Sequence, residues 1–337
     1  MKKVTDFACY LTRFFSVHLT GVRNLSKNTV MAYRDTFRLL LLFCQDVVGI
    51  APEKLTMAMI DDNLVVRYLD WLQGVRNCSI LTRNQRLAAI HSFFRYLQTQ
   101  DPQYMFLCQK ILLIPFKKTS KACIRHLTPD QTAILLKQPN MQTKTGRRDV
   151  TLLSVLYDTG ARVQEICDLR VRDVRLEYPA LVTLTGKGRK SRHVPLLGNT
   201  VSLLRVYMQE NALIQNGKQD APLFFNQLHA AMTRGGISHI LQKYTNMAAL
   251  QHPDMPEKVT PHVLRHSKAT HLLQAGVNLI YIRDILGHVS IQTTEIYARV
   301  DMETKRKILE DVYAEITPEG LPNWNRDGNL LDFLENL

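Results

Sequence analysis

The chain has 337 residues, enough for two domains, and with 45% hydrophobic and 22% charged residues it is expected to be globular and not disordered. Its formal net charge of +13 points to a polyanionic partner such as nucleic acid. Six scattered cysteines without C-x-x-C spacing suggest neither a disulfide framework nor a zinc site, which fits a reducing cytoplasm. The sequence lacks a signal-peptide pattern and a bilayer-length apolar run, so no membrane association is expected.

The basic excess is spread over the body of the chain. Residues 1–115 carry 14 basic and 8 acidic side chains, and residues 116–317 carry 28 and 18. Residues 318–337 carry only 1 basic and 4 acidic side chains. Both of the domains proposed below, and not an appended basic arm, are therefore expected to face the polyanion.

Residues 1–115 are predicted to form a small bundle of amphipathic helices. Apolar spacing and capping residues predict four helices: residues 6–19, one from an N-cap at Ser26 to residue 44, one capped by Asp61 or Asp62, and residues 80–99. Three arginines are expected on the polar side of the fourth helix, either as a solvated face or as contacts to DNA phosphates: Arg83, Arg86 and Arg95.

Residues 116–125 are predicted to be a basic interdomain linker, because they are polar and follow Pro115. The basic side chains of this segment could lie along a DNA backbone or simply keep the linker soluble. The candidates for DNA contact are Lys117, Lys118 and Lys121.

Residues 126–317 are predicted to form a mostly helical domain with a small antiparallel sheet near its start. Thr128 and Pro129 begin one helix, and a second covers residues 149–159 and ends at Gly160. Three short strands are expected at residues 171–176, 180–185 and 192–196, with a turn at residues 186–188. Helices are expected again after residue 199.

Several residues in this domain suit phosphodiester cleavage by a tyrosine. A phenol with a pKa of about 10 must lose its proton, and charge on the phosphoryl oxygens must be stabilised. The guanidiniums of Arg162 and Arg265 can bind those oxygens with paired hydrogen bonds. His262, three residues before Arg265, can face the same site and move a proton.

The remaining candidate catalytic residues lie at or near predicted turns. Lys187 stands at the tip of the predicted hairpin, where it can protonate a leaving oxygen or act as a general phosphate contact beside Arg189, Lys190 and Arg192. A helix stop at Gly287 frees His288 to turn inward, and Ser290 is expected to cap the helix that carries Tyr297. His262 and His266 have a metal-ligand spacing, but no third ligand accompanies them, so no metal is expected.

The joint order of these residues resembles the tyrosine recombinases, the phage integrase and Xer group. The pattern consists of T-G-A-R ending at Arg162, Lys187, H-V-L-R-H from His262, L-G-H ending at His288, and Tyr297 nine residues later. The resemblance is close over residues 126–300 and covers residues 1–115 only in helical character. It implies a two-domain, C-shaped clamp on double-stranded DNA.

The resemblance also implies the roles of the residues. Arg162 and Arg265 would bind the scissile phosphate, Tyr297 would form a 3′-phosphotyrosyl link, and His262 would assist the proton of the tyrosine. His288 would bond a phosphate oxygen, and Lys187 would protonate the 5′-hydroxyl. Neither ATP nor a metal would be required. Glu165 matches an acidic position that orients the arginine or a histidine, although an ordinary surface glutamate remains an alternative.

Residues 318–337 form an acidic tail with an apolar helical stripe in its last eight residues. By resemblance, this tail is expected to dock on a neighbouring protomer of a synaptic tetramer; docking on its own domain is the alternative.

Three alternatives to the favoured function stay open at this point. A mobile-element integrase or transposase is favoured over an Xer-type resolvase of chromosome or plasmid dimers. A type IB topoisomerase would use similar chemistry, and a non-catalytic DNA-binding protein would use none. The expected setting is the cytoplasm, at the nucleoid, with accessory DNA-bending factors as further partners.

Overall fold

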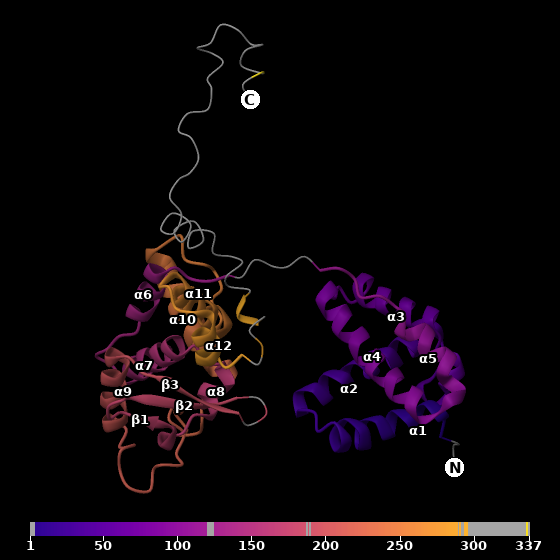
Figure 1. Cartoon of the computed structure of the whole chain (residues 1–337), viewed down its shortest axis with the longest axis horizontal. Helices are drawn as coiled ribbons and strands as arrows, with labels where there is room; N and C mark the ends of the chain where they lie inside the picture. The colour runs from indigo at the N-terminus through magenta and orange to yellow at the C-terminus, as the bar shows by residue number, and fades with distance from the viewer. Residues whose placement is uncertain are drawn as a thin grey trace. The chain divides into compact units, whose positions relative to one another are not determined.

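The computed structural model describes residues 4–119, 125–186, 188, 190–288, 290, 293–295 and 335. The chain forms two compact units, Met1–Ala122 and Cys123–Leu337, which are considered separately (Figure 1). The expected helices after residue 300 and the apolar stripe of the tail lie outside the described residues. In the described part of the chain, every helix is too short or too polar to cross a membrane.

The first unit is helical, as predicted. Its α-helices are α1 (Asp6–Arg13), α2 (Lys27–Phe43), α3 (Asp62–Gly74), α4 (Ile80–Gln100) and α5 (Met105–Leu112). Two π-helical segments, η1 (Phe14–Val22) and η2 (Cys44–Val48), continue α1 and α2, and three short 3-10 turns connect the rest: η3 (Pro52–Lys54), η4 (Met57–Met59) and η5 (Pro102–Tyr104).

Two of the expected helix starts in this unit are confirmed. Ser26 Oγ accepts a hydrogen bond from the Thr29 amide over 3.3 Å, and Asp61 Oδ1 accepts one from the Leu64 amide over 2.7 Å. Helix α5 was not predicted. Its eight residues are too few, and too apolar on several sides, to give a clear amphipathic period.

Aromatic side chains fill the core of the first unit. The ring centroid of Phe93 on α4 lies 5.3 Å from that of Phe14 on η1 and 5.2 Å from that of Phe37 on α2. Both contacts are edge-to-face. Buried aromatic rings therefore join η1, α2 and α4.

The second unit combines helices with one small sheet. It contains α6 (Pro129–Lys137), α7 (Lys144–Thr159), α8 (Val163–Asp168), η6 (Val171–Asp173), β1 (Val174–Arg175), β2 (Leu181–Thr185), β3 (Ser191–Pro195), α9 (Gly198–Glu210), α10 (Arg234–Gln251), α11 (Pro261–Gln274) and α12 (Leu279–Leu286). The strands are antiparallel in the order β1-β2-β3, with Leu184 opposite Arg192.

The first predicted strand was too long. Residues Val171–Asp173 form the 3-10 turn η6 instead, and only Val174–Arg175 pairs with β2. The turn is fixed at its start because Asp173 Oδ2 accepts a hydrogen bond from the Arg170 amide over 2.9 Å. A local side-chain bond of this kind competes with strand pairing.

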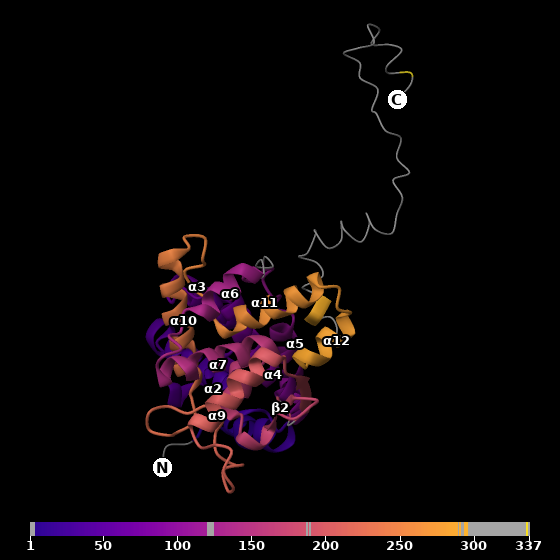
Figure 2. The ribbon, with the colours of Figure 1, turned by 90° about the vertical axis from the view of Figure 1, so that its left-hand side faces the viewer.

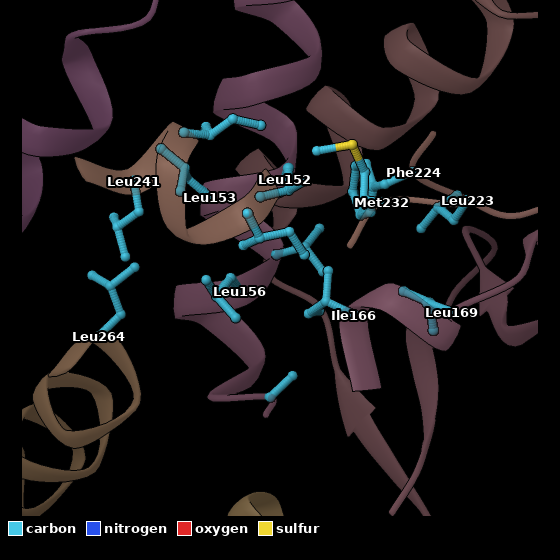
Figure 3. Packing of buried hydrophobic residues seen from close by; sticks show 14 of the residues in the cluster. Leu152, Leu153, Leu156, Ile166, Leu169, Leu223, Phe224, Met232, Leu241 and Leu264 are labelled. Atoms are coloured by element: carbon cyan, nitrogen blue, oxygen red, sulfur yellow. The ribbon is translucent and has the colours of Figure 1, made fainter. Parts of the chain in front are cut away.

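Helix α7 lies at the centre of the second unit and packs against α6, α9 and α11. Figure 2 shows α6, α10 and α11 grouped beside it. Figure 3 shows the core that results, in which Leu152, Leu153 and Leu156 of α7 meet leucines of α10 and α11. This core supports the C-terminal ends of α7 and α12 and the N-terminal part of α11. The candidate site lies where these three segments meet.

Candidate active site

A cavity of about 340 Å³, lined mainly by charged residues, opens beside the C-terminal end of α12. It is lined by Arg162, Gly186, Lys190, Ser191, Arg192, Arg283, Asp284, Gly287 and His288. A larger cavity of about 630 Å³ lies between α1 and α2 in the first unit, but its lining is mostly apolar and includes none of the predicted catalytic residues. The chemistry therefore centres on the smaller cavity.

Two glycines bring the helix ends of this site together. Helix α7 ends at Gly160, which has a φ of 56°, and α12 ends at Gly287, which has a φ of 64°. A Cβ atom on Gly160 would stand 2.7 Å from Leu286 Cδ2, so a side chain at this position would force the buried Leu286 side chain to shift. Both predicted helix stops are confirmed, and Arg162, two residues after Gly160, is the N-cap residue of α8.

Three arginines bind three successive carbonyl oxygens at the end of α12. The last carbonyls of a helix have no partner within the helix and form the negative end of its dipole, which favours cations there. The three arginines come from the start of α8, from β3 and from α11, so one helix end gathers three guanidiniums, of which Arg162 and Arg192 line the cavity. The pairs are Arg192 Nε with Ile285 O at 2.8 Å, Arg265 Nη2 with Leu286 O at 2.7 Å, and Arg162 Nη2 with Gly287 O at 3.1 Å.

The two predicted phosphate-binding arginines differ in exposure. Arg265 is only 4% exposed, and its Nη1 also donates to the Gly160 carbonyl over 2.6 Å. The side chain of Arg162 is 36% exposed and borders the cavity. Arg265 thus ties the ends of α7 and α12 together, while Arg162 presents charge to the open space.

Glu165 is buried and binds two arginines. Its Oε1 accepts from Arg162 Nη1 over 2.9 Å, and its two oxygens accept from Arg192 Nη1 and Nη2 over 2.8 Å each. Burial alone raises the pKa of the Glu165 carboxyl, but the bonds and charges of Arg192 and Arg162 outweigh it and hold this pKa at about 2. The alternative of an ordinary surface glutamate is wrong, since Glu165 is 4% exposed.

His288 turns inward after Gly287, as the sequence predicts. Its Nδ1 lies 2.9 Å from the hydroxyl of Thr294, which is fully buried. Burial lowers the pKa of His288 to about 4, and the charges of Arg265, Arg162 and Arg192 act in the same direction. The imidazole is therefore neutral near pH 7. If its Nδ1 accepts the hydrogen bond from the Thr294 hydroxyl, its Nε2 carries the proton and acts as a donor.

The other predicted catalytic residues lie elsewhere or outside the described residues. His262 is exposed in the first turn of α11, which begins after the N-cap Thr260, and it does not belong to the described lining of the cavity. Lys187 and Tyr297 lie outside the described residues. The Thr293 amide donates a hydrogen bond to the Ser290 carbonyl, and residues 293–295 are helical, where a helix was predicted.

The residues predicted to contact DNA from the first unit and the linker have varied surroundings. Arg83 is only 4% exposed, so its assignment to the solvated side of α4 is wrong; the helix buries this position beside Leu87 and Ile90. Arg86 is half-buried and donates to the Ala32 carbonyl over 2.8 Å. Arg95 and Lys118 are exposed, whereas Lys117 Nζ donates to Gln73 Oε1 over 2.5 Å.

The residues of the β2–β3 hairpin that were predicted to contact DNA also differ in their surroundings. Lys190 is exposed, and its carbonyl accepts from the Gly186 amide over 2.9 Å. Arg192, predicted only as a DNA contact, has its guanidinium bonded to Glu165 and to the end of α12, a link to the site that sequence reasoning missed. Its strand position, opposite Leu184 on the face of the sheet toward α8 and α12, is the signal that could have identified it. Lys121 and Arg189 lie outside the described residues.

Within the described residues, no group of three or more His, Cys, Asp or Glu side chains is arranged to hold a metal ion. His266, the candidate metal partner of His262, is half-buried in α11, and burial together with His262 and Arg265 lowers its pKa.

Both units match known sequence families. Residues 125–304 match the phage integrase family, and residues 12–101 match the phage integrase N-terminal SAM-like domain. A protein of Sinorhizobium fredii that carries the name integrase/recombinase y4rC is 36% identical over 340 residues, which cover 100% of both chains. A tyrosine recombinase XerC of Pelobacter propionicus is 32% identical over 310 residues, 91% of this chain and 96% of that protein.

A solved structure agrees with these matches. The XerH site-specific recombinase bound to a palindromic difH substrate, in a post-cleavage complex, superposes with a TM-score of 0.69. It is 25% identical and covers 86% of this chain and 80% of that one. The fold similarity therefore extends over most of the chain.

Proposed function

Since this chain belongs to the phage integrase family and is a tyrosine site-specific recombinase, we propose that it cuts and rejoins double-stranded DNA through Tyr297 to integrate or excise a mobile element. The observation that carries this proposal is the gathering of Arg162, Arg265 and a neutral His288 around the end of α12. Two fixed guanidiniums and one neutral donor form a site for a phosphate whose negative charge grows during reaction.

The proposed reaction has two transesterification steps. The phenolic oxygen of Tyr297 bonds to the phosphorus while the bond from phosphorus to the 5′-oxygen breaks. His262 assists removal of the phenol proton, and Lys187 donates a proton to the leaving 5′-oxygen. A 5′-hydroxyl from a partner DNA strand then attacks the phosphotyrosine, forms a new phosphodiester and restores the phenol. The phosphotyrosyl bond retains the energy of the original linkage, so we propose that neither ATP nor metal takes part.

One further function has specific support. The 32% identity to a XerC recombinase favours resolution of chromosome or plasmid dimers as the alternative role. In either role the protein would act on DNA at the nucleoid.

A plasmid assay tests the proposal and separates these two roles. Two copies of the DNA that flanks the gene would be placed on one plasmid, and two copies of the chromosomal terminus site on another. Recombination of the first plasmid alone would support the mobile-element role, and recombination of the second alone would support dimer resolution. Recombination of neither plasmid, in a cell that expresses the protein, would contradict the proposal.

We further propose that four protomers assemble on two DNA sites and that residues 318–337 dock on a neighbouring protomer. The acidic charge and apolar stripe of this segment suit a helix that binds an apolar groove rimmed by basic side chains. A protein that ends at residue 319 is expected to cleave one DNA site but to lose cooperative binding and strand exchange. Intact strand exchange by the shortened protein would contradict the docking role.

A further inference from the structure

Arg192 is a residue of β3 beside the end of α12, and every nitrogen of its guanidinium is bonded to the protein. Its Nε donates to the Ile285 carbonyl over 2.8 Å, and its Nη1 and Nη2 each donate to one oxygen of Glu165 over 2.8 Å. Its side chain is only 12% exposed. A planar guanidinium bound on two edges in this way is fixed in orientation.

The packing around Arg192 leaves it little room to turn toward DNA. A Cβ atom on Gly287 would stand 2.9 Å from both Cδ and Nη1 of Arg192, so the absence of a side chain at Gly287 lets the arginine lie against the end of α12. Lys190, two residues earlier on the hairpin, is exposed. Arg192 and Lys190 line the same cavity. The charge of Arg192 is bound to Glu165, whereas the side chain of Lys190 is exposed.

Arg192 also shares an acceptor with a predicted phosphate-binding residue. Oε1 of Glu165 accepts from Arg192 Nη1 over 2.8 Å and from Arg162 Nη1 over 2.9 Å. The position of the carboxylate therefore depends on Arg192, and the position of Arg162 depends on the carboxylate. Without Arg192, Glu165 would lose two of its bonds, and the Ile285 carbonyl would lose the bond that holds it to β3.

We propose that Arg192 is a positioning residue for DNA cleavage: it fixes Glu165 and the end of α12, and through them Arg162 and His288, and it does not bind a DNA phosphate. This inference rests on the proposed role of Arg162 in binding the scissile phosphate. Because near-attack geometry tolerates little displacement, loss of this support should slow the chemical step more than it weakens DNA binding.

Three variants of the full chain test this proposal against a phosphate-contact role. Arg192→Gln removes the charge, Arg192→Lys keeps the charge without the two-edged fork, and Lys190→Gln removes an exposed charge from the same hairpin. Arg175→Gln serves as a matched control, because Arg175 of β1 also donates to a backbone carbonyl, that of Pro179, but lies outside the lining of the cavity. Thermal unfolding would establish that each variant is folded.

The measurements are the dissociation constant for DNA, its dependence on salt, and the single-turnover rate of phosphotyrosine formation at saturating DNA. The DNA in these assays would be a duplex from the flanks of the gene, chosen because the wild-type protein forms a covalent adduct with it. We expect both Arg192 variants to cleave about 10²-fold more slowly. Their affinity and salt dependence should stay close to those of the wild type, whereas Lys190→Gln should bind more weakly with a shallower salt dependence.

A second measurement separates positioning from a general loss of structure. Because Arg192 acts in part through Glu165, the cleavage defect of the double variant Arg192→Gln, Glu165→Gln should be smaller than the product of the two single defects. Multiplied defects would overturn the proposal. So would weaker binding with a normal cleavage rate, normal behaviour in every assay, or unfolding of Arg192→Lys as well as Arg192→Gln.

The wild type provides the control for the function itself. If the wild type forms no covalent adduct with any flanking DNA, the proposed function fails. If it forms the adduct and the Arg192 variants form it at the same rate, only the positioning role fails.

Discussion

The guanidinium of Arg265 donates to the carbonyl oxygen of Leu286 over 2.7 Å, and so attaches α11 to the last turn of α12. Since Arg265 is buried and also bonds the end of α7, it has a structural task besides the binding of phosphate. Arg162 bonds the next carbonyl of the same helix end but is 36% exposed in its side chain. The two arginines should therefore respond differently to the same substitution.

Arg265→Gln is expected to destabilise the fold much more than Arg162→Gln. The first variant leaves two buried carbonyls without their donor, at a cost of about 1–3 kcal/mol each. The second leaves Glu165 its two bonds from Arg192 and frees only the partly exposed Gly287 carbonyl, so it should cost less, about 1 kcal/mol. Urea denaturation of both variants measures the difference, and both should lose DNA cleavage by about 10²-fold or more. Equal losses of stability would contradict the structural role of Arg265.

Gly287→Ala should be more harmful than an alanine at another left-handed glycine. Gly287 has a φ of 64°, and an added Cβ would meet Arg192 at 2.9 Å. Gly217 is the matched control, because its φ is 86° and nothing lies within 4 Å of the added Cβ. Backbone strain costs each variant about 1–2 kcal/mol. The contact with Arg192 should add a further loss of stability and slow cleavage in Gly287→Ala alone, and unfolding and cleavage measurements that find the two variants equivalent would refute this.

Acid should destabilise the second unit through three half-buried histidines. Burial lowers the pKa of His288 from 6.5 to about 4, and it also lowers the pKa of His266 and of His271. Above pH 6.5 these groups are neutral in both folded and unfolded chains, so they leave stability unchanged. Between pH 6.5 and pH 4 the unfolded chain binds protons that the folded chain does not, and the free energy of unfolding falls.

Each group that differs by one proton contributes a slope of about 1.4 kcal/mol per pH unit. His288→Asn should reduce the total slope in that window. Urea denaturation at several pH values measures the slopes. Below pH 4.5 a further loss is expected, because the pKa of Glu165 is about 2 in the folded chain and protonation removes its ion pairs. Equal slopes for the wild type and His288→Asn would contradict the assignment.

Much of the second unit followed from local sequence signals. Gly160 and Gly287 predicted the helix stops because a left-handed residue at the end of a helix is most often glycine. Thr128 predicted a helix start because its hydroxyl satisfies an amide that the helix leaves without a partner, and Ser26 did the same in the first unit. The order of Arg162, Arg265 and His288 indicated the family, since these residues carry the resemblance together.

What the sequence could not supply was the direction of side chains across distant segments. Arg83 and Arg192 are both arginines in a basic chain, and an arginine is expected at the surface. Arg83 is nevertheless buried, and Arg192 is held by Glu165 and Ile285, which lie 27 and 93 residues away in the chain. Such placements depend on tertiary packing, which no local pattern encodes.

Covalent trapping on DNA tests the central claim, that Tyr297 is the nucleophile. The wild type, Tyr297→Phe and Tyr281→Phe would be incubated with DNA from the flanks of the gene, in the presence of a metal chelator and without ATP. Tyr281 is the control because it is a tyrosine of α12 that is 66% exposed. We predict a denaturant-resistant adduct at the DNA 3′ end with the wild type and Tyr281→Phe, and none with Tyr297→Phe despite normal DNA binding. An adduct that persists in Tyr297→Phe would contradict the account.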